Sequence, residues 1–144
     1  MKFVKTDSAG FLINHMARIF AQELTARIKP LGLTTGTFPA LLELWDQDGL
    51  TQKQLVERLG IEQATMANTL NRMERDGLVT RRKDPKDGRA QLVWLTDHAR
   101  GLRDPAIAAA EGVNGDLLAG LSGEERAQLL ALMRKVIAGQ AEGD

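Results

Sequence analysis

The sequence predicts a mainly α-helical fold with one small β-hairpin, in which a helix-turn-helix and its hairpin wing are flanked by helices at both ends. Three observations predict it. Apolar residues recur at helical spacing through most of the chain. Two short helical segments meet at Gly60, and two β-prone segments joined by a turn follow directly. We expect a single domain over 1–144, with the winged lobe at 34–96 and flanking helices at 8–30 and 97–140.

The first two helices are predicted from apolar stripes and from the positions of prolines. The segment 11–29 carries apolar residues close to helical spacing and stops before Pro30. The segment 35–46 carries a second apolar stripe, and Pro39 is compatible with a helix there only in its first turn.

The helix-turn-helix is predicted over 51–76. Thr51 and Gln54 match a capping box, in which the hydroxyl caps a backbone N–H and the amide reaches back to the first residue. Gly60 stands where a helix ends in the left-handed conformation, and after a short turn the next helix is expected over 62–76.

The outward face of the 62–76 helix is small, amide-bearing and basic. At about 100° per residue, Met66, Leu70 and Met73 share the opposite, buried side. Small residues let a backbone approach closely, asparagine can pair with an adenine edge, and arginine can pair with guanine or phosphate. The residues predicted to contact DNA from this helix are Gln63, Ala64, Thr65, Ala67, Asn68, Asn71, Arg72 and Arg75.

The hairpin is predicted from strands at 78–83 and 90–95, with a projecting connection between them. Val93 and Leu95 share the face expected to pack inward. Arginine suits the negative potential of a narrow minor groove, and Asp87 is expected to orient the Arg89 guanidinium. The predicted wing contacts are Arg81, Arg82, Lys83, Lys86, Asp87 and Arg89.

Two further helices are predicted after the hairpin. One runs over 97–118, with a bend near Asp104 because a proline follows. Ser122 and Glu125 form a second capping box and open a final helix with one apolar face. Since amphipathic helices lie on both sides of the lobe, pairing with a second copy across a two-fold axis is the economical way to bury them.

The distribution of charge predicts an anionic partner. The chain has zero net charge, but residues 72–100 hold eight basic and five acidic side chains, against four and seven in residues 101–144. A local basic region on a neutral protein is typical of nucleic-acid recognition. The alternative for the bias taken alone is an ordinary solvated surface.

Composition excludes several other functions. The chain has no cysteine and two histidines, so we expect no disulfide, thiol-based sensing, metal site or cofactor. No set of histidine, acid and nucleophile and no glycine-rich phosphate loop is visible, so an enzyme is not expected. The apolar runs are too short to span a membrane, which makes a cytoplasmic protein the expectation.

The segment "IEQATMANTLNRMERDGLVTRRKDPKDGRAQLVWLT", residues 61–96, resembles the MarR family of bacterial transcriptional regulators. "RMERDGLVTR" matches the family's passage from recognition helix to wing. Asp87, Arg89, Leu95 and Thr96 meet its wing pattern of an Asp shortly before an Arg and a closing Leu-Thr. The order and spacing of these motifs make the resemblance specific, and it extends over about 11–136.

The resemblance implies a homodimer that binds a pseudo-palindromic operator in double-stranded DNA and controls transcription, often as a repressor released by a small, commonly aromatic, molecule. It assigns the minor-groove contact of the wing to Arg89. The family's usual basic residue on the recognition helix falls on Asn68, and a second wing arginine is replaced by Gly88. These departures imply a different base preference and a weaker wing contact.

Between the dimer helices and the lobe, the resemblance implies an effector pocket. The candidate lining residues are His15, Arg18, Phe38, Leu42 and Trp45. Aromatic residues at helical spacing are more often core, and a surface arginine is more often solvated. A winged-helix module for protein contacts remains the alternative function, but such a module has no need for a basic wing tip.

Overall fold

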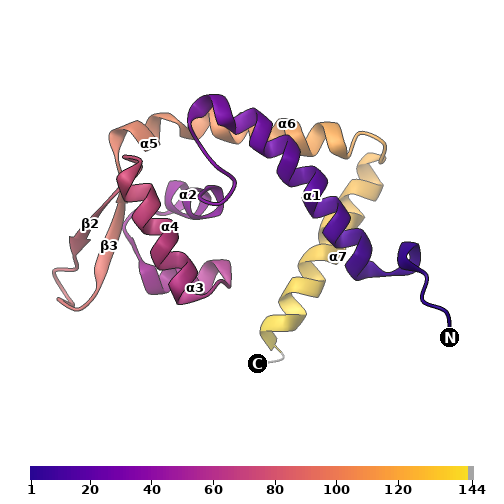
Figure 1. The fold of residues 1–144 in the computed structure, drawn as a ribbon, viewed down its shortest axis with the longest axis horizontal. Helices are drawn as coiled ribbons and strands as arrows, with labels where there is room; N and C mark the ends of the chain where they lie inside the picture. The colour runs from indigo at the N-terminus through magenta and orange to yellow at the C-terminus, as the bar shows by residue number, and fades with distance from the viewer. Residues whose placement is uncertain (143–144) are drawn as a thin grey trace.

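The computed structural model describes residues 1–142 and is mainly helical, with a small antiparallel sheet (Figure 1). Its α-helices and strands are α1 (Ala9–Ile28), α2 (Phe38–Asp46), β1 (Leu50–Thr51), α3 (Gln52–Leu59), α4 (Gln63–Arg75), β2 (Val79–Lys83), β3 (Gln91–Leu95), α5 (Asp97–Gly101), α6 (Arg103–Leu117) and α7 (Gly123–Glu142). Short 3₁₀ turns lie at Lys5–Asp7 and Lys29–Leu31. The predicted fold class is confirmed.

The molecule has a compact lobe and an extended helical arm (Figure 1). The lobe contains α2 to α4 and the sheet. In the arm, α6 runs away from the lobe beside α1, and α7 crosses α1 (Figure 1). The Arg27 guanidinium joins α1 to α6 through a 2.7 Å bond to Asp116. This hydrogen bond is the main cause that raises the pKa of Arg27 above its ordinary value.

Local signals placed most helix ends correctly. The Thr51 hydroxyl accepts a bond from the Gln54 N–H at 3.1 Å, and the Gln54 amide oxygen accepts from the Thr51 N–H at 2.8 Å. Pro39 falls in the first turn of α2, as the helix requires. Gly60 ends α3 with a φ of 63°, a conformation that suits glycine.

Two features of the fold differ from the prediction. The helix expected over 97–118 is divided into α5 and α6 at Leu102, two residues before the expected bend. The two-residue strand β1 was not predicted, because so short a strand has no alternating pattern. It pairs with β3, which makes β3 the central strand of the order β1-β3-β2.

The core of the lobe lies between α2, α3, α4 and the inner face of the sheet. Val79, Val93 and Leu95 are buried on that face, as the alternation predicted for the last two. Trp94 lies on the other face and packs over Gly49, where an added Cβ would come within 2.6 Å of its ring. Within residues 1–142, no helix is long and apolar enough to cross a membrane.

Candidate nucleic-acid interface

The recognition helix α4 presents the predicted face to solvent. Met66, Leu70 and Met73 are fully buried beneath it. Of the eight predicted contact residues, seven are exposed and Ala67 is half-buried. Thr69 is also buried, which the helical periodicity did not predict. Its hydroxyl donates to the Thr65 carbonyl at 2.9 Å, so its burial leaves no polar group unsatisfied.

The helix-turn-helix is fixed by contacts on both sides of its turn. The Gly60 N–H donates to the Val56 carbonyl at 2.9 Å and closes α3. Gln52, in the first turn of α3, reaches Gln63 at the start of α4, with 3.4 Å between their amide groups. The first residues of α3 and α4 therefore lie next to each other.

The tip of the wing is shaped by aspartates that accept backbone hydrogen bonds. Asp84 Oδ1 accepts from the Lys86 N–H at 2.9 Å, and Asp87 Oδ1 accepts from the Arg89 N–H at 3.1 Å. The expectation that Asp87 orients the Arg89 guanidinium is therefore corrected, because the bond it makes goes to the backbone. Asp87 fixes the turn, and the Arg89 side chain is exposed.

The basic residues of the wing differ in how far their side chains are exposed. Arg82 and Lys83 are exposed near the tip, as are Lys86 and Arg89. Arg81 differs, since its side chain is only 18% exposed. It lies opposite Val93 on the inner face of the sheet and donates a hydrogen bond from Nη2 to the Asn71 Oδ1. Arg81 therefore binds within the protein rather than projecting toward a ligand.

A polar groove separates the wing tip from the start of α3. Its volume is about 610 Å³, and Lys53, Lys83 and Arg89 contribute cations to its walls. Asp84 and Asp87 also line it. Lys53 was not among the residues predicted to contact DNA. The signal for it was its place in the first turn of a capped helix, beside backbone N–H groups that favour anions.

Two arginines of α4 lie near other parts of the lobe. The Arg72 guanidinium lies beside Gly36, where an added Cβ would be 3.5 Å from Nη2. Arg75 pairs with Asp76 at 3.6 Å, and its side chain is 72% exposed. Both guanidinium groups remain on the surface of the lobe.

The five predicted effector residues lie in different surroundings. Phe38 is buried and packs edge-on against Trp45, with 6.0 Å between ring centroids. Trp45 Nε1 donates to the Ala99 carbonyl at 3.0 Å. His15 and Arg18 are exposed on α1, and Leu42 is 38% exposed on α2.

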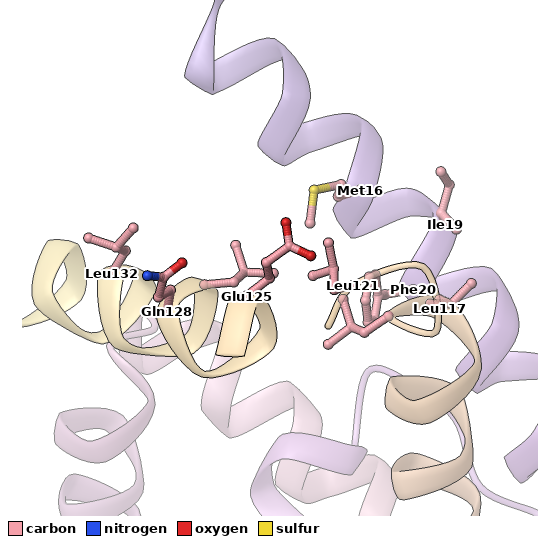
Figure 2. Close-up of a pocket in the computed structure, with 10 residues that line it drawn as sticks. Met16, Ile19, Phe20, Leu117, Leu121, Glu125, Gln128 and Leu132 are labelled. Atoms are coloured by element: carbon pink, nitrogen blue, oxygen red, sulfur yellow. The ribbon is translucent and has the colours of Figure 1, made fainter. Parts of the chain in front are cut away.

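The arm contains an apolar hollow that the sequence did not predict. It lies between α1, the end of α6 and α7, and measures about 620 Å³ (Figure 2). Its apolar lining comes from Met16, Ile19, Phe20, Leu117, Leu118, Leu121, Leu129 and Leu132, and Glu125 and Gln128 stand at the side of α7.

Residues 31–90, which include the helix-turn-helix and most of the wing, match the family model described as MarR family. The transcriptional regulator HosA of Escherichia coli O111:H- is 35% identical over 125 residues. The match covers 85% of this chain and 93% of HosA. The chain belongs to the MarR family.

Solved MarR-type structures share its whole architecture. The PcaV transcriptional regulator of Streptomyces coelicolor, solved with its natural ligand, has a TM-score of 0.86 and 25% identity, covering 96% of this chain and 97% of PcaV. A putative MarR family regulator of Listeria monocytogenes, solved with a 26mer DNA, has a TM-score of 0.83 and 24% identity, covering 99% of this chain and 92% of that one. The protein is thus a MarR-family transcriptional regulator, and these relatives are regulators rather than enzymes.

Proposed function

We propose that this MarR-family regulator binds operator DNA as a homodimer, with α4 in the major groove and the wing tip beside the neighbouring backbone and minor groove. The observation that carries the proposal is the outward face of α4, which combines small, amide and basic side chains and lies next to a wing tip with four exposed cations. The Listeria relative solved with DNA supports it.

In this proposal the phosphate backbone of the DNA lies along the groove between the wing and α3. Lys53, Lys83 and Arg89 line it, and the capped start of α3 adds the positive end of a helix dipole. Phosphate contacts of this kind fix the register of a protein on the duplex, and contacts from α4 supply the sequence preference.

The dimer is proposed from apolar surface that the chain does not cover by itself. On α7, Leu132 is 60% exposed, Val136 63% and Ile137 70%, and Ile13 on α1 is 61% exposed. None of residues 123–141 of α7 is buried. Most of the stability of a helix in a protein comes from the packing of its apolar face, so the apolar face of α7 needs a partner. A second copy, packed through 8–30 and 97–140, supplies it and fills the apolar hollow of Figure 2.

We further propose that the protein represses transcription and is released by a small organic effector. PcaV, solved with its natural ligand, supports ligand control in this fold. A cavity of about 170 Å³ lies between α1, Thr35 and α6, where the arm meets the lobe. It is smaller than most ligand sites, so a bound effector would widen it and move the lobe relative to the arm.

The cavity at Thr35 is lined mainly by apolar groups, together with the polar Asn114. An aromatic ring fits this lining better than a highly charged metabolite does, because burying an unpaired charge is costly. In a dimer, the exposed His15 and Arg18 of α1 are available as polar contacts for such an effector.

The DNA-binding proposal is tested by titrating labelled promoter fragments at several salt concentrations. Affinity should fall steeply with salt. Arg89→Ala should weaken binding and reduce the slope of log K against log[salt] by about 0.9 for each phosphate that the variant no longer neutralises. Arg103→Ala is the matched control, since Arg103 is exposed on the arm and pairs with Asp104. Absence of any binding at low salt would favour the protein-contact module instead.

A further inference from the structure

One arginine of the wing binds back onto the recognition helix. Arg81 shares the inner face of the sheet with buried Val79, and its Nε is buried without a hydrogen-bond partner. That Nε lies 3.7 Å from the Glu74 Oε2. Its Nη2 donates to the Asn71 Oδ1. A single guanidinium thus joins β2 to two residues of α4.

This contact determines which way round the Asn71 amide stands. A guanidinium carries only donors, so the Asn71 atom that faces Arg81 must be the oxygen. The amide nitrogen, with two N–H groups, is then the end available to a ligand. Asn71 is exposed on the outward face of α4, one turn after Asn68.

The orientation limits what Asn71 can recognise on a base pair. A bidentate pair with adenine needs the amide oxygen to accept from N6 while the nitrogen donates to N7. In this protein the Asn71 Oδ1 already accepts from the Arg81 guanidinium. The positive charge and N–H groups of Arg81 disfavour the approach of the adenine N6 amino group to the same oxygen. Guanine presents two acceptors, O6 and N7, and thymine presents O4, and these fit the free N–H groups. Adenine presents one acceptor, N7, next to the N6 donor, so it fits them less well.

We propose that Arg81 is a positioning residue for base recognition: it holds Asn71 as a hydrogen-bond donor, so that Asn71 reads guanine or thymine and disfavours adenine. The inference rests on the proposed DNA binding by α4. It differs from the sequence prediction in two respects, since Arg81 binds Asn71 rather than DNA and Asn71 does not pair with adenine.

Three variants of the full chain separate the roles. Asn71→Asp keeps an oxygen for Arg81 but removes the outward N–H groups. Arg81→Met keeps an unbranched apolar stem and frees the Asn71 oxygen. Arg103→Met is the control, because Arg103 is exposed on the arm, where it pairs with Asp104. Each protein is used to select duplexes from a library of random sequence, and the bound pools are sequenced.

The wild-type pool should prefer guanine or thymine at one position of each half-site, and Asn71→Asp should lose that preference. In the Arg81→Met pool, adenine at that position should rise by about two- to tenfold, the range expected for one hydrogen bond. Arg103→Met should keep the wild-type preference. Thermal melting establishes that each variant folds. If Arg81→Met does not fold, Asn71→Asp still tests whether Asn71 donates to guanine or thymine.

Three results would overturn the inference while leaving DNA binding intact. The first is a wild-type preference for adenine at the position that Asn71→Asp alters. The second is an Arg81→Met pool identical to that of the wild type. The third is an Asn71→Asp variant that loses affinity equally on every sequence, which would show a contact to phosphate alone. If the wild type retains no duplex at all, the proposed function fails and this inference fails with it.

Discussion

Replacing Val136 with glutamate should separate the proposed dimer into monomers. Val136 lies on the apolar face of α7 and is 63% exposed in the single chain. A two-fold axis places the substitution twice in one interface, so two carboxylates replace two apolar side chains in each dimer. The DNA affinity should fall as well, because a monomer can occupy only one half-site.

The size of the effect follows from the exposed fraction of Val136. Full burial of such a side chain contributes about 1.5–3 kcal/mol. Since 63% of the side chain remains to be covered, association gains roughly 1–2 kcal/mol per copy, or about 2–4 kcal/mol per dimer. At about 1.4 kcal/mol for each tenfold change, the dissociation constant should rise by about 30- to 700-fold. Desolvation of two carboxylates adds to this loss.

Sedimentation equilibrium over a wide range of concentration measures the change directly. Ala127→Glu is the matched control, because Ala127 is exposed and lies about two and a half turns earlier on the opposite side of α7. It adds the same charge to the same helix and should leave the dimer intact. A dimer of unchanged affinity in Val136→Glu would show that this face of α7 is not the interface.

Three other substitutions, two of them with a control variant, test the lobe. Gly49→Ala should destabilise the fold by on the order of 2–5 kcal/mol in urea unfolding, since it combines a left-handed φ with a clash. Gly60→Ala has a similar φ but open space around it, so it should cost only about 1–2 kcal/mol. Lys53→Ala should lower DNA affinity equally for all sequences and reduce the salt slope by about 0.9. Asp48 accepts hydrogen bonds from the Leu95 N–H and from Arg100, and so joins β3 to α5. Asp48→Ala should therefore broaden the distribution of distances between spin labels on the two wing tips of the dimer, whereas Asp46→Ala, at an exposed position, should not.

The elements of the lobe could be predicted because their signals are local. The capping box at Thr51, the left-handed Gly60 and the alternation of Val93 with Trp94 each depend on residues close together in the chain. Such signals place helices and strands to within a few residues. The predicted burial of Met66, Leu70 and Met73 follows from the same periodicity and is confirmed.

The contacts of charged side chains could not be predicted, because they depend on packing between distant segments. Arg81 was expected to contact DNA from the wing, yet the inward face of β2 brings it to Asn71 on the preceding helix. Asp87 was expected at a guanidinium, yet the turn brings the Arg89 N–H within its reach. Lys53 lines the groove only because the wing folds beside α3.

The lobe is tied together from its recognition helix to α5. Arg81 joins β2 to α4, and Asp48 accepts from the Leu95 N–H at 2.8 Å and from Arg100 Nη2 at 3.2 Å, which joins β3 to α5. The helical path is interrupted at Leu102, before α6 begins. An effector that widens the cavity between arm and lobe should therefore move each lobe as a unit.

Such a movement changes the spacing of the two recognition helices without changing the surface of either one. The half-sites of an operator lie about one helical turn apart, so a dimer with altered spacing cannot engage both. An effector should then weaken binding to a duplex with two half-sites but leave binding to a single half-site unchanged. Fluorescence anisotropy on the two duplexes measures this difference. Equal weakening on both would mean that the effector acts on α4 or the wing itself, and the rigid lobe would not be the element that carries the signal.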